Sequence, residues 1–234
     1  MPAVLVAIPE EAAVFTRFAH DVISEGLREG TVLIESESGP FLLVITGAGM
    51  TAAAAATALT LHHPPAGVEI AAVISAGTCG GMPGRVKRGD IVAATRCVDW
   101  SADCTSVGYE WGQITDEHVR YLSDRHLLSA AIADGAVAGV FASANVFATP
   151  ESVATITAGF PDAIIADMES AAIAQIAYRA GVPFLSLTCV SDMCSGDGGD
   201  EFNANVFDAS EASARAVLRL CATIALANAP AEIA

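Results

Sequence analysis

The segment DAIIADMESAAIA, residues 162–174, decides how this chain is expected to fold. It begins as a continuous apolar run and, after Asp167 and Glu169, becomes an alanine-rich stretch typical of a helix. A second segment, VPFLSLTCVSD at residues 182–192, is also an apolar run and stops at Asp192. Uninterrupted apolar strands are typical of sheets that are covered on both faces. The two segments therefore predict buried strands of an α/β domain, with acidic residues where the strands end.

Strand-like and helix-like patterns alternate along the rest of the chain. Further strands are expected at residues 4–8, 31–36, 41–46, 68–76, 91–98 and 137–143. Helices are expected from Pro9 to about Leu27, within 47–63, from Glu151 to about Ala158, from Glu169 to Ala180 and from Ala209 to Ala227. The turn SGP between 31–36 and 41–46 predicts a hairpin. We found no linker, repeat or composition break, so residues 1–234 are predicted to form a single α/β domain with a mixed central β-sheet flanked by helices on both faces.

The composition argues against several classes of protein. Hydrophobic residues make up 53% of the chain and the mean hydropathy is +0.50, which provides a core and argues against disorder. The net charge of −16 repels phosphate backbones and anionic lipid, so neither a nucleic acid nor a membrane is expected as a partner. Glu10 and Glu11 follow the first apolar run too soon for a signal peptide. We expect a soluble protein.

The cysteines indicate a reducing compartment. They form no C-x-x-C pair, and no histidine stands at metal-ligand spacing from them, so neither a disulfide framework nor a metal site is expected. Scattered thiols are typical of the cytoplasm. The six are Cys79, Cys97, Cys104, Cys189, Cys194 and Cys221.

Two glycine-rich segments could hold a ligand. GAGMTAAAAA, residues 47–56, lacks both the G-x-G-x-x-G spacing and a P-loop lysine, which favours an ordinary turn into a helix. SAGTCGG, residues 75–81, allows close approach of the backbone, and Thr78 adds a hydroxyl group. Whether this second segment is a structural turn or a binding loop is left open by the residues alone.

Acidic residues follow three of the expected strands: Glu10 and Glu11, then Asp167 and Glu169, then Asp192. A single acid at a strand end is usually a solvated residue or a helix cap. In α/β sheets, however, ligands bind beyond the carboxyl ends of the strands. Three carboxylate sites on one sheet edge suit proton transfer and sugar binding, as in hydrolysis of a glycosidic bond.

Seven motifs occur in the order seen in a known family. They are AIPEEAAVF (7–15), GAGMTAAAAATAL (47–59), SAGTCGGMPGRVKRGDIV (75–92), VGYEWGQ (107–113), SANVF (143–147), ADMESAAIA (166–174) and VPFLSLTCVSD (182–192). Together they resemble the 5′-methylthioadenosine/S-adenosylhomocysteine nucleosidases, which belong to the purine nucleoside and uridine phosphorylase superfamily. The resemblance implies a nucleoside phosphorylase-like fold and hydrolysis of the N-glycosidic bond of these nucleosides, with release of adenine and no cofactor.

The resemblance also implies roles for single residues. Glu11 matches the glutamate that activates the attacking water, although the register leaves Glu10 open. Asp192 resembles the acid that protonates purine N7 and so makes the base a better leaving group. Glu169 resembles the residue that binds the ribose hydroxyls. The other implied substrate contacts are Met168 at the sugar, Phe147 and Ala148 at the purine, Ser191 beside Asp192, and Ala48 and Phe202 near the 5′-alkylthio group.

The stretch VGYEWGQ implies a homodimer. Val107 and Tyr109 match residues that a second subunit contributes to its neighbour's 5′-pocket, so residues near 107–111 are expected to complete the neighbour's site. The alternative is that Tyr109 and Trp111 are ordinary aromatic residues of a surface turn.

Differences from the phosphorylases favour water as the nucleophile. Acids stand in the early segment where phosphorylases carry a basic phosphate ligand, and Ser75 replaces their arginine. Glu11 would also repel a phosphate dianion. Within the nucleosidases, Val107 stands where an aromatic residue is common and Asp167 where glutamate is common.

Three alternative functions stay open. One is a futalosine or aminofutalosine hydrolase, which ranks second because that relative tends to have asparagine where this chain has Asp192. Another is a phosphate-dependent purine nucleoside phosphorylase. The third is a non-catalytic nucleoside-binding protein, which would need neither Glu11 nor Asp192.

Overall fold

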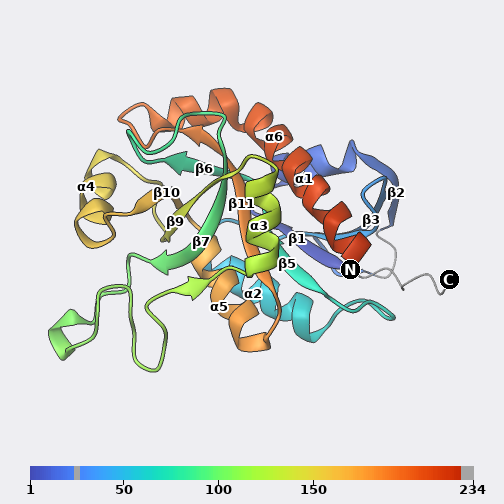
Figure 1. The fold of residues 1–234 in the computed structure, drawn as a ribbon, viewed down its shortest axis with the longest axis horizontal. Coiled ribbons are helices and arrows are strands. Elements are labelled where there is room, and N and C mark those ends of the chain that lie inside the picture. Colours follow the sequence, from blue (N-terminus) through green and yellow to red (C-terminus); the bar gives the residue numbers. More distant parts are fainter. Residues whose placement is uncertain (24–26, 228–234) are drawn as a thin grey trace.

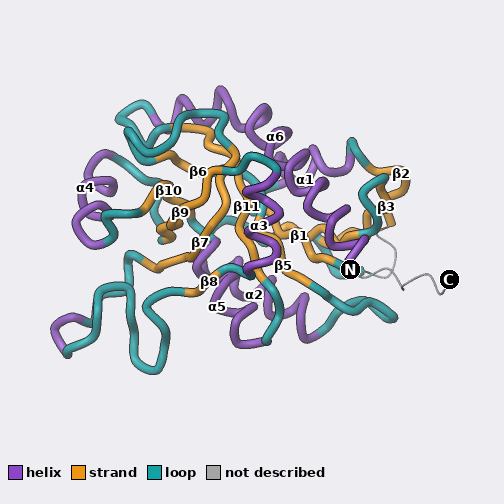
Figure 2. Tube along the Cα trace, in the orientation of Figure 1, coloured by secondary structure: helices purple, strands orange, loops and turns teal. Residues whose placement is uncertain are grey.

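A mixed β-sheet runs through the middle of the molecule, with helices on both of its faces (Figures 1 and 2). The computed structural model describes residues 1–23 and 27–227. The strands are β1 (Pro2–Val6), β2 (Ala19–Ile23), β3 (Thr31–Ser36), β4 (Phe41–Ile45), β5 (Ala72–Ser75), β6 (Thr78–Gly81), β7 (Ile91–Asp99), β8 (Tyr121–Leu122), β9 (Val137–Ser143), β10 (Ala163–Asp167) and β11 (Phe184–Asp192). The helices are α1 (Pro9–Thr16), α2 (Met50–His62), α3 (Arg125–Ala133), α4 (Pro150–Gly159), α5 (Ser170–Ala180) and α6 (Gly198–Ala227), with a short 3₁₀ helix at Thr105–Val107. The predicted fold class is confirmed, and the predicted hairpin is formed by β3 and β4.

Strand β11 joins two parts of the sheet. Its beginning, Phe184–Ser186, pairs in parallel with β5 in the order β2-β3-β4-β1-β5-β11. Its middle, Leu187–Cys189, pairs antiparallel with β7, and its end pairs in parallel with β6. Strands β11, β6, β10, β9 and β7 therefore close into a ring of paired strands. All of β11 is buried, which explains its continuous apolar sequence.

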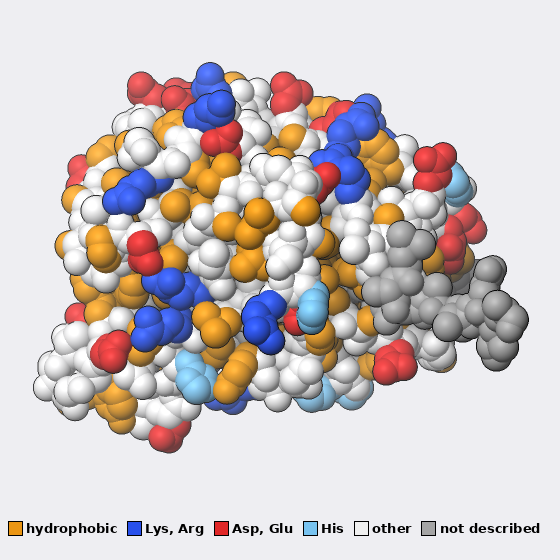
Figure 3. Space-filling view, viewed as in Figure 1, with side chains coloured by type: hydrophobic (Ala, Val, Ile, Leu, Met, Phe, Trp, Pro, Cys, Tyr) orange, Lys and Arg blue, Asp and Glu red, His pale blue; other side chains and the backbone are white. Residues whose placement is uncertain are grey.

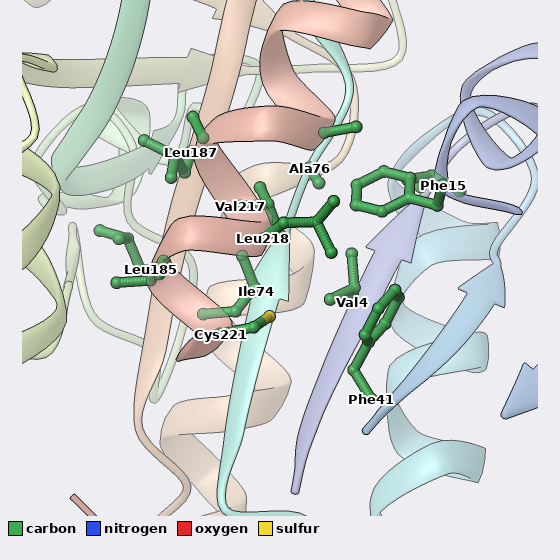
Figure 4. Close-up of a cluster of buried hydrophobic side chains, with 14 of the residues drawn as sticks. Val4, Phe15, Phe41, Ile74, Ala76, Leu185, Leu187, Val217, Leu218 and Cys221 are labelled. Atoms are coloured by element: carbon green, nitrogen blue, oxygen red, sulfur yellow. The ribbon is translucent and has the colours of Figure 1, made fainter. Parts of the chain in front are cut away.

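Two clusters of buried side chains hold the strands from opposite faces. Under α1, α3 and α6, the cluster includes Phe15, Leu185 and Val217 (Figure 4). Under α2 and α5, it includes Phe141 and Ile173. Because such interiors are close-packed, they fix the strand ends to which the polar residues are attached.

The helix expected from Pro9 to about Leu27 was wrong beyond its first half. Helix α1 ends at Thr16, and residues 19–23 form the edge strand β2, which pairs antiparallel with β3. Pairing with β3 and the β-branched residues Val22 and Ile23 favour the strand. Residues 24–26 of the expected helix lie outside the described residues.

The helix expected from Ala209 begins earlier, at Gly198. Residues 199–208 are exposed or half-buried, so no apolar periodicity marks these turns, and Gly198 and Gly199 argue against a helix. The sequence analysis also missed α3. Its start is nevertheless marked by Asp124, whose carboxylate accepts hydrogen bonds from the backbone N–H groups of His126 and Leu127.

On the surface shown in Figure 3, acidic and basic side chains are interspersed with hydrophobic ones. Within residues 1–23 and 27–227, no helix is long and apolar enough to cross a membrane. The assignment of residues 1–234 to a single domain stays a prediction, and residues 228–234 lie outside the described residues.

Candidate active site

A cavity of about 230 Å³ opens where β1, β10 and β11 end. Strands β1 and β5 are parallel, and so are β5 and β11, so their carboxyl ends lie at one edge of the sheet. Eleven residues that the sequence analysis singled out line this cavity: Glu11, Ala48, Thr78, Phe147, Ala148, Asp167, Met168, Glu169, Ser191, Asp192 and Phe202. The structure therefore brings together residues that are far apart in the chain.

Glu11 is tied to two strand ends by four hydrogen bonds. Its Oε2 accepts from the backbone N–H of Ala7 (2.9 Å) and Ile8 (3.3 Å). Its Oε1 accepts from the N–H (2.9 Å) and the hydroxyl group (3.0 Å) of Thr78. Burial raises the pKa of Glu11, and these hydrogen bonds oppose the rise. Glu10 is exposed and does not line the cavity, so the geometry favours Glu11 as the site residue.

The turn before β6 leaves room for Glu11 because it contains Gly77. This residue has a φ of +120°, and a Cβ atom there would overlap the Glu11 carboxylate. Glycine is therefore required both by the backbone and by the close approach of the acid. The segment 75–81, which the sequence left open, is thus part of the cavity wall.

Asp192 is the last residue of β11 and is buried. Its Oδ1 accepts from the backbone N–H of Cys194 (3.0 Å), and its Oδ2 accepts from the Ser191 hydroxyl (3.0 Å). Burial raises the pKa of Asp192, against the effect of these two donors. A carboxyl group in such surroundings can keep a proton for a leaving group.

Asp167 is the last residue of β10, and Glu169 stands at the start of α5. The Oε1 atom of Glu169 accepts from the backbone N–H of Gly49 at 2.7 Å. Burial and, next, the nearby carboxylate of Asp167 raise the pKa of Glu169 to about 8. The Oδ1 atom of Asp167 accepts a hydrogen bond from the Ser143 hydroxyl group at 2.5 Å, and burial raises the pKa of Asp167.

The cavity holds four carboxyl groups, from Glu11, Asp167, Glu169 and Asp192. Among the described residues that line it, none is a lysine, arginine or histidine. Like charges at close range cannot all be ionised, so the cavity retains protons near neutral pH. The same arrangement repels a phosphate dianion.

The apolar part of the cavity is marked by two aromatic rings. Phe147 and Phe202 meet edge to face, with ring centroids 5.9 Å apart. Phe147 is 45% exposed, so its ring has a free face on which a flat base could stack. Phe202 comes from the first turns of α6, the part of the helix that the sequence analysis missed.

Val107 and Tyr109 do not line this chain's cavity. They lie on the segment 100–120, which extends from the body of the molecule at the lower left of Figure 1, and Val107 is 71% exposed. The base of the segment is fixed by Trp111. Its ring packs on Phe160 with centroids 5.6 Å apart, and its Nε1–H donates to the carbonyl of Trp100 at 2.8 Å. Trp111 is therefore an anchor and not an ordinary surface-turn residue.

The cavity is also lined by residues that sequence reasoning did not select, namely Ala7, Ile8, Cys79, Gly80, Val146 and Ala166. All of them lie within the motifs quoted above, and this was the available signal. Within the described part of the chain, no group of three His, Cys, Asp or Glu side chains is placed to hold a metal ion.

The chain is similar to known proteins both in its sequence and in its fold. Residues 3–226 match the model of the Phosphorylase superfamily. A 5′-methylthioadenosine/S-adenosylhomocysteine nucleosidase from Staphylococcus saprophyticus is 33% identical over 192 residues, which cover 78% of this chain and 82% of the relative. The same-named enzyme of Neisseria meningitidis, solved in complex with methylthio-immucillin-A, has a TM-score of 0.85 and 29% identity over 94% of this chain and 98% of its own. That of Colwellia psychrerythraea, solved in complex with adenine, has a TM-score of 0.87 and 26% identity over 94% and 93%.

Proposed function

The chain belongs to the 5′-methylthioadenosine/S-adenosylhomocysteine nucleosidase family of the phosphorylase superfamily, and we infer from this that it hydrolyses the N-glycosidic bond of these nucleosides and releases adenine. It is thus an N-glycosyl hydrolase. Beyond family membership, the assignment rests on the cavity. Glu11 and Asp192 are both buried in it, and no basic side chain of the described residues lines it.

In the reaction that we propose, two carboxyl groups divide the proton transfers. Asp192, in its protonated form, donates to purine N7 as the bond between C1′ and N9 breaks and its electron pair moves onto the base. A water molecule attacks C1′, whose ribose has become oxocarbenium-like. Glu11, in its ionised form, takes a proton from that water. The products are adenine and a 5′-substituted ribose. Asp192 is left ionised and Glu11 protonated, and the cycle closes when solvent takes the proton from Glu11 and returns one to Asp192.

The other lining residues supply binding. Glu169 accepts and donates hydrogen bonds at the ribose hydroxyls, and Met168 packs against the sugar. Phe147 stacks on the purine, while Ser191 orients Asp192. The remaining contacts are the backbone of Ala148 at the base edge, Ala48 and Phe202 at the 5′-alkylthio group, and Thr78, whose hydroxyl and N–H hold Glu11.

The partner that we propose is a second copy of this chain. Val107 and Tyr109 lie outside the cavity of their own chain, on a segment that is anchored at its base and exposed at its tip. Such a segment suits insertion into a neighbour's 5′-pocket. The compartment that we propose is the cytoplasm, on the ground that all six cysteines are free thiols.

The test is a product assay by chromatography. Purified protein is incubated with 5′-methylthioadenosine, S-adenosylhomocysteine, aminofutalosine, futalosine and inosine, each with and without phosphate. We expect free adenine from the first two nucleosides, at a rate that phosphate does not change.

Three outcomes would contradict the proposal. Release that requires phosphate and yields a sugar 1-phosphate would assign a phosphorylase. Faster release of base from futalosine or aminofutalosine would assign that substrate class instead. No release from any nucleoside would favour a nucleoside-binding protein.

A further inference from the structure

Asp167 lines the cavity beside the proposed ribose ligand, yet the reaction proposed above, on which this inference rests, gives it no role. It is the last residue of β10 and pairs in register with Ser143, the last residue of the parallel strand β9. Asp167 also lines a second, much smaller cavity of about 10 Å³, together with Glu11 and Glu169. The three carboxyl groups thus border one small space.

The hydrogen bonds around Asp167 run in one direction, toward its carboxylate. The Ser143 hydroxyl donates to its Oδ1 at 2.5 Å, and the oxygen of that hydroxyl accepts the backbone N–H of Ala171 at 2.9 Å. The hydroxyl and N–H of Ser170 and the N–H of Glu169 also donate to Asp167. The Ser170 hydroxyl lies 2.7 Å from that of Ser186, which can donate to it in turn. Two hydroxyl and two backbone donors thus favour the ionised form of this carboxyl group.

Glu169 has weaker support for a negative charge. The donors described around it are the backbone N–H groups of Gly49 and Met168. Its charged neighbours are Asp167 on β10 and Glu11 on α1, and both disfavour a second negative charge. The N-termini of two helices supply positive potential nearby. That of α2 reaches Glu169 through the Gly49 N–H, whereas the first N–H groups of α5, on Glu169 and Ser170, donate to Asp167. Of the two neighbouring carboxyl groups, Glu169 is therefore the one that retains a proton.

We propose that Asp167 is a positioning residue that keeps one proton on Glu169, so that Glu169 meets the ribose hydroxyls as a neutral group that both donates and accepts hydrogen bonds. The Oε1 atom of Glu169 is occupied by the Gly49 N–H, so the proton stands on Oε2. A neutral Glu169 also adds no second negative charge beside Glu11, which must ionise to act as a base.

The first test is stability against pH, which needs neither substrate nor turnover. A group whose pKa is higher in the folded than in the unfolded protein stabilises the fold at low pH, and this stabilisation is lost as pH rises through the folded pKa. For Glu169 that window runs from the ordinary value of 4.5 to about 8. Across it, this group lowers the ratio of folded to unfolded protein by about tenfold per pH unit. The Glu169→Gln variant should not show this loss of stability with rising pH. In Asp167→Asn the loss should end at a lower pH, because the folded pKa of Glu169 is lower there.

The matched control is Asp162→Asn, the same change at an exposed aspartate just before β10. Its stability curve should parallel that of the wild-type protein. If Asp167→Asn fails to fold, the comparison of Glu169→Gln with wild type still tests whether Glu169 holds a proton in the folded protein. Parallel curves for those two proteins would overturn the proposal.

The second test is a double-mutant cycle on kcat/KM. Asp167→Asn should lower kcat/KM at pH 7.5 by about tenfold, mainly through KM, because Glu169 then ionises. Since glutamine is always neutral, Asp167→Asn should have no further effect in a Glu169→Gln background, and Asp167→Glu should restore activity. Additive losses would show that Asp167 acts independently of Glu169 and would overturn the proposal. A wild-type protein that releases no adenine would refute the proposed function instead, and the stability curves would still test Asp167.

Discussion

At Asp192, burial and two hydrogen-bond donors act on the same carboxyl group in opposite directions. In Asp192→Asn, the amide oxygen can still accept the Cys194 N–H, but the side chain can no longer give a proton to N7. We expect kcat to fall by about 10²- to 10⁴-fold, with a melting temperature close to that of the wild type. Steady-state assays and a thermal melt check this. Near-normal turnover with a normal melt would refute the role of Asp192 as the acid.

A second prediction for single residues concerns the acid limb of the pH profile. The Thr78 hydroxyl stabilises the ionised form of Glu11, so Thr78→Val should raise the pKa of Glu11 further. The acid limb of the kcat/KM profile should then move to higher pH, so that kcat/KM at the low-pH end falls by about tenfold. The alkaline limb, which Asp192 sets, should not move. Thr155→Val, at an exposed threonine of α4, is the control. A profile that shifts equally at both limbs would contradict the assignment.

How far single residues could be predicted depends on what their neighbours in sequence reveal. Glu169 and Asp192 were predictable because each stands at the end of an apolar run that is typical of a buried strand. The choice between Glu10 and Glu11 could not be predicted. It depends on which side chain reaches the N–H of Thr78, which lies 67 positions after Glu11 in the chain. The significance of Asp167 likewise depends on Ser143 in the neighbouring strand.

At the scale of elements, continuous apolar runs predicted β10 and β11 well, whereas helix α6 was predicted only where it is buried. Its first turns carry little apolar surface, and their apolar contact is made with a residue of another segment, Phe147. Closure of the strand ring by the pairing of β11 with β7 was also not predictable, because the sequence of neither strand indicates which strand it pairs with. Local patterns indicate which face of an element is buried, but not what buries it.

The first turns of α6 can be tested with two phenylalanines of the same helix. Phe202→Ala removes a ring from the cavity, and we expect KM for 5′-methylthioadenosine to rise by about tenfold or more. Because the surrounding turns are largely exposed, stability should change by less than about 1 kcal/mol. Phe207→Ala is the matched control, since Phe207 is 49% exposed and does not line the cavity. Equal KM values for the two variants would contradict a substrate contact at Phe202.

At the scale of the whole molecule, the proposed dimer predicts complementation between two defective chains. Tyr109→Ala would lack the residue given to the neighbour, and Asp192→Asn the acid of its own cavity. In a mixed dimer, one cavity has both an intact Asp192 and an intact Tyr109 from the partner. Adding inactive Asp192→Asn protein to Tyr109→Ala protein should therefore raise the total rate of adenine release. The double variant Tyr109→Ala/Asp192→Asn should give no such increase when added instead, and an unchanged rate with both would argue for cavities complete within one chain.

The double role of β11 also has a consequence for how the protein forms during synthesis. Its pairing partners β5, β6 and β7 lie about a hundred residues earlier in the chain. The pairing of these three strands with β11 therefore cannot form until β11 has left the ribosome. The first five strands can pair with one another before that point, but the gap between β5 and β7 stays open. The strand that fills this gap also carries Asp192. A nascent or truncated chain that has not yet filled this gap therefore also lacks its acid, so activity cannot begin before the sheet is closed.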